Sequence, residues 1–354
     1  MRGSFLYGLA TAFLFLHPGE ALRGQAGTAP LPAWIAAFDG GSGLTAERVA
    51  NLRSAAEAGD AVAENNLGAA YALGKGVELS SEEAAGWFRL AAKAGYAPAE
   101  ANLGYLYEKG LGVAQDYDAA LKLYRAAADS GYAPAQTRIG LFYENGWVVE
   151  PNTSEAVRWY RLAAEQGSAE GQHKLGNCYY AGRGVPRDYI EAANWFRKAA
   201  EQGDPVAQNN LGALYHHGLG MKQDYAEAFR WYKLAADQRL PGAANDLGVL
   251  YEDGTGVEKD YQQAARLYRW AATHGVSRGE FDLARLYHAG KGVPLDYVTA
   301  AYWYSRALAD GEPQAALGLK ELSTIMTPRQ KQAATAMLAD GESATAATVA
   351  MRLR

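Results

Sequence analysis

Apolar positions recur with the spacing of a helix along most of this chain. In one stretch they fall at i, i+4, i+5 and i+8, namely Ala135, Ile139, Gly140 and Tyr143. In the next stretch they fall at i, i+3, i+4, i+7 and i+8, namely Ala156, Trp159, Tyr160, Ala163 and Ala164. Each spacing gathers the apolar residues on one face of a helix. The pattern predicts two amphipathic helices in succession and no strands.

The two helices form a unit that returns every 36 residues. Its clearest marker is a Leu-Gly pair or a close equivalent, which begins at Leu67, Leu103, Ile139, Leu175, Leu211, Leu247 and Leu283. A tyrosine keeps the same phase at Tyr71, Tyr107, Tyr143, Tyr179, Tyr215, Tyr251 and Tyr287. Seven units in one phase predict a repeat architecture in which each unit buries its apolar face against its neighbours.

The predicted helix ends have a physical cause in the sequence. A glycine three residues after the repeated tyrosine, such as Gly110, supplies the left-handed residue that ends the first helix. An Asp or Asn caps the second helix, at Asp116, Asn152, Asp188, Asp224, Asp260 and Asp296. Another glycine ends the second helix in most units, but the fifth unit has Arg239 there.

The glycine in the middle of the first helix needs a separate explanation. It costs about 1 kcal/mol relative to alanine in a helix interior, so its repetition indicates close packing against a neighbouring helix. We expect the bulk on the other side to come from the repeated tryptophans of the second helix: Trp87, Trp159, Trp195, Trp231 and Trp303.

Shorter segments flank the repeats and complete the predicted domain organisation. Residues 44–59 match a second helix and form an N-terminal cap, residues 60–311 hold the seven repeats, and residues 312–339 form C-terminal capping helices. A linker at 22–43 and an Ala/Thr-rich tail at 340–354 lie outside them. In the linker, Trp34, Ile35 and Phe38 either dock onto the first repeat or belong to a loose connection.

The averaged unit, A-x-x-x-L-G-x-x-Y-x-x-G-x-G-V-x-x-D-Y-x-x-A-x-x-W-Y-x-x-A-A-x-x-G, resembles the Sel-one-like repeat (SLR) family, relatives of the tetratricopeptide repeats. The resemblance covers about residues 45–338. It implies an all-α, right-handed α/α superhelical solenoid of helix-turn-helix repeats. It also implies an adaptor or regulator that holds partners on its surface, often in exported bacterial proteins or the eukaryotic secretory pathway.

Composition and charge exclude several classes of function. Net charge is −5, with 34 basic and 39 acidic residues, so the chain lacks the cationic field that nucleic acid requires. Cys178 is the only cysteine, so the affinity for β-lactams proposed for cysteine-rich SLR proteins is not carried over. The histidines His173, His216 and His288 lie in different units, too far apart to share a metal ion. No cofactor or metal site and no nucleophile with its base is predicted.

The N-terminus has the order of a secretory signal. Arg2 precedes an apolar run at Phe5–Leu16, and small residues follow at Gly19 and Ala21. The run is too short to span a bilayer. We expect residues 1–21 to be a signal peptide cleaved near Ala21, with Ala26 as the second choice, and the mature protein to be periplasmic or secreted without a stable membrane span. A first helix of the fold is the alternative.

The candidate binding surface is the polar side of the first helices. We expect it to line the concave surface, with Asn102, Tyr105, Arg138, Lys174, Asn177, Asn210, His216, Asp246, Asp282 and Arg285. On this interpretation the groove is neutral at one end, basic in its middle and acidic towards its C-terminal end, so a segment of matching charge binds in one direction. The alternative is a solvated face whose charges vary freely.

Trp147 stands out because it occupies a turn, out of phase with the other tryptophans. It is either an anchor for a partner or packs over its own repeat. The function expected of the whole chain is a non-catalytic scaffold for a protein or peptide. The alternatives are a cell-wall-associated enzyme or an inhibitor of one, with peptidoglycan association, and a eukaryotic secretory-pathway adaptor.

Overall fold

A computed structural model describes residues 32, 35 and 46–342 of the chain. The segment predicted to be a signal peptide, most of the predicted linker and the last residues of the tail lie outside the described residues. The chain divides into two compact units. Residues 32, 35 and 46–223 are described in the N-terminal unit, and residues 224–342 in the C-terminal unit.

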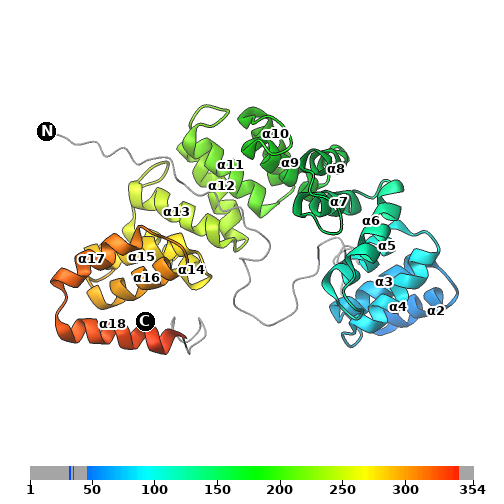
Figure 1. Ribbon diagram of the computed structural model, residues 1–354, viewed down its shortest axis with the longest axis horizontal. Helices are drawn as coiled ribbons and strands as arrows, with labels where there is room; N and C mark the ends of the chain where they lie inside the picture. Colours follow the sequence, from blue (N-terminus) through cyan, green and yellow to red (C-terminus); the bar gives the residue numbers. More distant parts are fainter. Residues whose placement is uncertain (1–31, 33–34, 36–45, 343–354) are drawn as a thin grey trace. The chain divides into compact units, whose positions relative to one another are not determined.

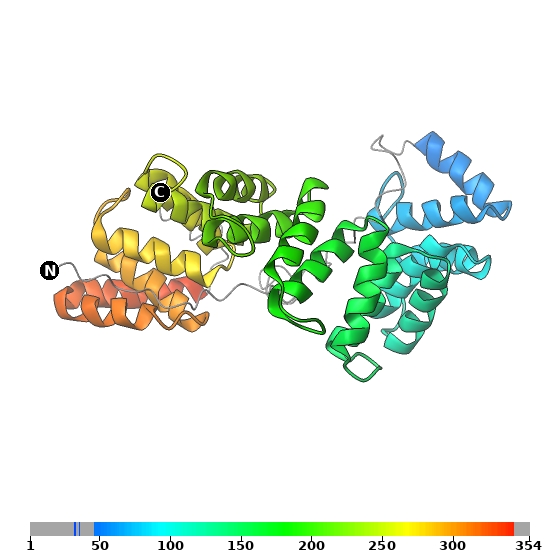
Figure 2. The same cartoon turned by 90° about the horizontal axis from the view of Figure 1, so that it is seen from above.

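Every regular element of the described residues is helical, and the helices follow one another in antiparallel pairs (Figures 1 and 2). The N-terminal unit holds α2 (Ala46–Glu57), α3 (Ala61–Leu73), α4 (Ser81–Lys93), α5 (Ala97–Lys109), α6 (Tyr117–Asp129), α7 (Ala133–Asn145), α8 (Thr153–Glu165), α9 (Ala169–Ala181), α10 (Tyr189–Glu201) and α11 (Pro205–His217). The C-terminal unit holds α12 (Tyr225–Asp237), α13 (Pro241–Asp253), α14 (Tyr261–Thr273), α15 (Ser277–Ala289), α16 (Tyr297–Ala309), α17 (Ala315–Ile325) and α18 (Pro328–Glu342). The predicted all-α solenoid of sequential helix pairs is confirmed.

The predicted caps set the helix ends. Asp116 Oδ1 accepts a hydrogen bond from the Ala119 amide at the start of α6, and the other predicted Asp and Asn caps of the second helices do the same in their repeats. Gly110 ends α5 with φ 68°. Because the caps are local, sequence spacing is enough to place them.

The repeated glycine of the first helix does pack tightly, but the expectation that a tryptophan faces it is wrong. The partner is the aromatic residue that follows the tryptophan. A Cβ on Gly68 would stand 2.8 Å from the Phe88 ring, and one on Gly176 would stand 2.7 Å from the Phe196 ring. One residue along a helix turns the side chain by about 100°, which points Phe88 and Phe196 at the glycine and the tryptophan elsewhere.

Two loop positions adopt a left-handed backbone without glycine. Arg239 has φ 64° where the other second helices end in glycine, and Val148 has φ 52° where the loops after the other first helices carry a second glycine. Both are sites of local strain, and more so at Val148, since a β-branched side chain tolerates this region least.

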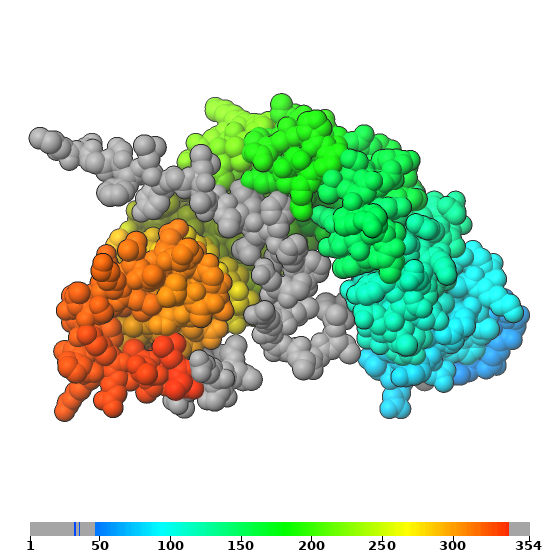
Figure 3. Space-filling model, in the orientation of Figure 1, coloured from blue at the N-terminus to red at the C-terminus, as the bar shows by residue number. Residues whose placement is uncertain are grey.

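The two ends of the described chain carry half-repeats. α2 packs on α3 at the N-terminal end. At the other end α17 and α18 both pack on α16, and Figure 3 shows them as the orange and red surface of the C-terminal unit. α18 runs to Glu342, beyond the expected end of the cap at residue 339.

Candidate binding surface

The first helices of the repeats line the inner side of each unit. α7 packs directly on α9, and α13 on α15, whereas among the described helices the second helices of successive repeats make no comparable contact. Elements on the inside of a curved stack lie closer together than those on its outside. We call the side of each unit that its first helices form the inner face of that unit: α3, α5, α7, α9 and α11 in the N-terminal unit, and α13 and α15 in the C-terminal unit.

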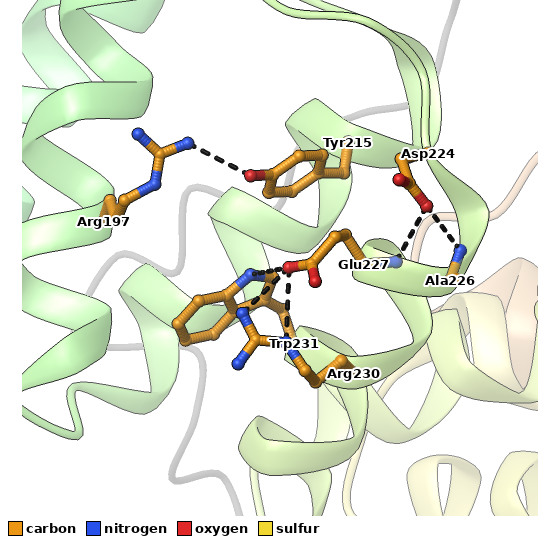
Figure 4. A network of polar contacts seen from close by, with 7 residues as sticks. All are labelled: Arg197, Tyr215, Asp224, Ala226, Glu227, Arg230 and Trp231. Atoms are coloured by element: carbon orange, nitrogen blue, oxygen red, sulfur yellow. Dashed lines mark hydrogen bonds and ion pairs between the residues drawn. The ribbon is translucent and has the colours of Figure 1, made fainter.

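The repeated tyrosine of the inner helices joins one repeat to the next. Arg197 on α10 donates a hydrogen bond to the Tyr215 hydroxyl on α11 at 3.1 Å (Figure 4). The same bond, always 18 residues apart, recurs at Arg53–Tyr71, Arg161–Tyr179 and Arg269–Tyr287. The tyrosines therefore stabilise the stack and are not a site in themselves.

A row of amides crosses the inner face of the N-terminal unit. Asn210 donates to Asn177 Oδ1 at 3.1 Å, from one first helix to the one before. Both are half-buried. Asn102 donates to Asn65 Oδ1 at 2.8 Å in the same way, but Asn102 is only 2% exposed. Asn177 and Asn210 therefore reach solvent, while Asn102 is buried between the helices.

His173 extends this row into the core. Its Nε2 lies 2.8 Å from Asn177 Nδ2. Burial and the neighbouring Lys174 lower the pKa of His173 to about 3, so the ring is neutral and accepts from the amide. Asp204 Oδ2 lies 3.8 Å from His173 Nδ1, and Asp204 Oδ1 accepts a hydrogen bond from the Ala207 amide at 2.7 Å. His173 is a structural group and fixes the side chain of Asn177.

Arg138 and Tyr105 meet at the next position along the inner face. The Arg138 guanidinium lies 5.4 Å from the centre of the Tyr105 ring and 3.7 Å from Glu108 Oε1. Glu108 is 1% exposed and accepts from the Tyr124 hydroxyl at 2.8 Å. The Arg138 side chain is 14% exposed. The basic centre expected here is therefore largely neutralised by a carboxylate that sequence reasoning did not include.

Lys174 and His216 have electrostatic surroundings that differ from those of Arg138. Lys174 is half-buried, one helical turn from Asn177 and on the same face. His216 stacks on His217 with ring centres 4.7 Å apart, and burial together with His217 lowers the pKa of His216 to about 4. Lys174 is thus the cation of the predicted set that stands beside the exposed amide row.

In the C-terminal unit the two predicted acidic residues, Asp246 and Asp282, differ in their burial. Asp246 is half-buried. Asp282 is 2% exposed and lies between Arg278 at 3.2 Å and Arg285 at 3.5 Å. Arg285 also pairs with Glu252, which accepts from the Tyr268 hydroxyl at 2.8 Å. Burial raises the pKa of Asp282 to about 6 against the opposing effect of the two arginines. Asp282 is thus held inside an ion cluster.

Trp147 packs on the neighbouring repeat. Its ring stacks on Tyr117 at 5.5 Å and meets Phe142 edge-on at 5.4 Å. It is half-buried in this position. Its contacts account for a structural role, and a role as partner anchor stays a prediction.

The polar residues that the sequence interpretation missed are Glu108, Glu252 and their tyrosine partners Tyr124 and Tyr268. A signal was present, because each glutamate directly follows the repeated tyrosine and each partner stands 16 residues later. A separate cluster on α12 joins Glu227 to Arg230 at 2.8 Å and to the Trp231 indole at 3.1 Å (Figure 4). It is not part of the inner face.

The chain belongs to the Sel1 repeat family. The family model matches residues 61–96, 97–132, 133–168, 169–204, 205–240, 241–276 and 277–312. These matches cover repeats only, and they contain no evident catalytic domain. No curated protein matches the chain.

The fold agrees with that of a solved Sel1 repeat structure. A Sel1 repeat protein from Oxalobacter formigenes is 32% identical over 82% of this chain and 85% of that one, with a TM-score of 0.59. A protective antigen present in uropathogenic Escherichia coli strains, displaying an SLR fold, is 28% identical over 87% of this chain and 82% of that one, with a TM-score of 0.48. No helix among the described residues is long and apolar enough to cross a membrane.

Proposed function

We propose that this protein is a non-catalytic scaffold outside the cytoplasm, and that it binds a protein or peptide segment on the inner face of its N-terminal unit. The observation that carries the proposal is the row formed by Lys174, Asn177 and Asn210. Hydrogen bonds hold its amides across successive repeats while the side chains still reach solvent. Polar groups fixed on rigid helices can bind a peptide backbone without first losing much conformational freedom.

The chemistry of the described residues supports binding over catalysis. Cys178 is buried, and burial with the nearby Glu144 raises the pKa of its thiol to about 12, so it is protonated at neutral pH and a poor nucleophile. His173 is fixed as a hydrogen-bond acceptor of the amide row. Neither side chain has the arrangement of an activated nucleophile with its base.

The direct test compares two charge reversals of equal size. Lys174→Glu changes the cation beside the amide row, and Lys122→Glu changes an exposed lysine on the second helix α6. Immobilised wild type and both variants are used to capture proteins from an extracytoplasmic extract. We expect one partner to bind wild type and Lys122→Glu, and to be lost with Lys174→Glu. A partner retained equally by all three proteins excludes this surface.

The catalytic alternative predicts turnover, so it is tested without a partner. Purified protein is incubated with peptidoglycan and, separately, with a β-lactam, and the products are measured by mass spectrometry. We expect no turnover of either. Turnover that disappears on substitution of an inner-face residue would replace the scaffold proposal with an enzymatic one.

The proposed location rests on the N-terminal residues and has its own test. Mass spectrometry of protein from its native host should find a mature chain that begins after Ala21 or Ala26. A chain that retains Arg2 contradicts export by a cleaved signal.

A further inference from the structure

Ile35 is buried although it lies ahead of all the repeats. It is 1% exposed, and its amide donates to the Pro32 carbonyl at 2.9 Å. It belongs to a hydrophobic cluster to which α3, α4 and α5 contribute Ala69, Ala72, Ala84, Ala85, Phe88, Ala91, Ala99, Leu103, Tyr105 and Leu106. Ile35 is therefore docked on the first two repeats, and we use the name Ile35 segment for the stretch of sequence that carries it.

Two alanines of the first repeat leave room for this side chain. Ala69 and Ala72 stand three residues apart on α3, and so share one face of the helix. The position of Ala72 holds a larger residue in each of the other repeats, namely Glu108, Glu144, Tyr180, His216, Glu252 and His288. Only the first repeat thus offers a small apolar surface at this place.

On α5, the residue that follows the Leu-Gly pair borders this small apolar surface. Tyr105, the equivalent of Ala69, is 3% exposed. Its ring carries Lys109 at 5.8 Å and Arg138 at 5.4 Å. The site therefore has an apolar surface bounded by the Tyr105 ring and its two neighbouring cations, Lys109 and Arg138. The apolar surface consists of Ala69, Ala72, Leu103 and Leu106. We call this site the aliphatic seat.

We propose that the aliphatic seat is a binding site for one aliphatic side chain of a short peptide segment, and that the Ile35 segment is its resident ligand within the same chain. The inference rests on the proposed function, since it assigns part of the inner face to a peptide. It adds a second element, because a partner that inserts an aliphatic side chain must first displace Ile35.

The tether makes this competition strong. A segment joined to its own binding site within one chain has an effective concentration that can be on the order of millimolar. For a peptide that binds with a Kd of about 1 μM, the tethered segment lowers the apparent affinity of an added peptide about a thousandfold. Release of Ile35 should restore that affinity.

The experiment uses the full chain and a synthetic peptide of residues 28–42 that carries a fluorescent label. Binding is followed by fluorescence anisotropy to wild type, to Ile35→Asp and to Ile35→Ala. We expect little binding to wild type, strong binding to Ile35→Asp and intermediate binding to Ile35→Ala. Ile190→Asp is the matched control, because Ile190 is 60% exposed on α10, and it should behave as wild type.

Three outcomes would overturn the proposal. The first is equal peptide binding to wild type and Ile35→Asp, and the second is no binding to Ile35→Asp or Ile35→Ala while circular dichroism shows full helix content. The third is a wild-type dimer that becomes a monomer in Ile35→Asp, since the segment would then be exchanged between two copies. A peptide with aspartate at the isoleucine position should bind none of the proteins. The assay needs no outside partner, so its failure leaves the capture experiment unaffected.

Discussion

The two units carry the same polar motif on their inner faces but complete it differently. A glutamate accepts from a tyrosine of the paired second helix and binds an arginine of the next first helix, as Glu108–Tyr124–Arg138 in the N-terminal unit and Glu252–Tyr268–Arg285 in the C-terminal unit. Arg138 stands just before the Leu-Gly equivalent Ile139-Gly140, whereas Arg285 follows Leu283-Ala284. The later position brings Arg285 next to Asp282, which lies 3.5 Å away.

The difference teaches that repeats which share the glutamate and its tyrosine partner can still place the arginine at different positions. In the N-terminal unit Arg138 forms an ion pair with Glu108, and Lys109 lies 2.8 Å from the same glutamate. In the C-terminal unit Arg285 forms ion pairs with two carboxylates, Glu252 and Asp282. Among the described residues, Arg138 thus has one ion-pair partner, Glu108, with Glu170 as a further nearby charge, whereas Arg285 has two ion-pair partners, Glu252 and Asp282.

The largest expected effect comes from removing the glutamate in each cluster. Glu108→Ala leaves the guanidinium of Arg138 without its ion-pair partner and the buried Tyr124 hydroxyl without its acceptor, and should lower the free energy of unfolding by about 3 kcal/mol. Glu252→Ala should cost about half of that, because Arg285 keeps Asp282. Urea denaturation measures both. Equal losses would show that Asp282 does not substitute for Glu252.

Acidification should affect the two units in opposite directions. In the N-terminal unit, burial lowers the pKa of His173 to about 3, so the unfolded state binds more protons and stability falls as pH drops from 7 to 5, by about 2 kcal/mol. In the C-terminal unit, burial raises the pKa of Glu280 to about 7 and that of Asp282 to about 6. There the folded state binds more protons, so stability rises over the same range by about 3 kcal/mol.

Hydrogen exchange at pH 7 and pH 5, corrected for the intrinsic rates, separates the units. We expect protection to fall in α9 and rise in α15. The variant Glu280→Gln should remove much of the rise in α15 and leave α9 unchanged. A parallel change in both units would contradict the assignment.

Trp147 provides a smaller test at a loop where the units differ. The equivalent residue in the C-terminal unit is Thr255, between Gly254 and Gly256. Trp147→Ala removes the stacking on Tyr117 and should lower the free energy of unfolding by about 1.5 kcal/mol. If this variant loses stability but still captures the partner, Trp147 is structural. Loss of the partner at unchanged stability makes it an anchor.

The smallest effect is expected where each unit has a non-glycine residue in a left-handed loop. Val148→Gly should raise the free energy of unfolding by about 1 kcal/mol, because valine tolerates φ 52° poorly. Arg239→Gly, at φ 64°, should raise it by about half as much, since arginine is not β-branched. Thermal unfolding of both variants tests the order. A larger gain at Arg239 would mean that contacts, and not backbone strain, dominate at Val148.

The sequence by itself determined the helices, their ends and the repeat. These features depend on neighbours within a few residues, such as the side-chain cap at Asp116 and the left-handed Gly110. The close contact to the repeated glycine was predicted to be the tryptophan of the second helix, but it is the aromatic residue one position later. The choice between the tryptophan and the next ring depends on how the two helices rotate against each other, and that is a tertiary property.

Only the tertiary structure decided which polar residues reach solvent. Asn102, Arg138, Lys174 and Asp282 hold the same position before the Leu-Gly pair or its equivalent, yet Asn102 and Asp282 are 2% exposed while Lys174 is half-buried. Their exposure depends on what lies across from them, such as Asn65 for Asn102. The docking of Ile35 likewise depends on space left by Ala69 and Ala72. Burial is set by residues about 30 or more positions away, and a periodic local pattern contains no information about such partners.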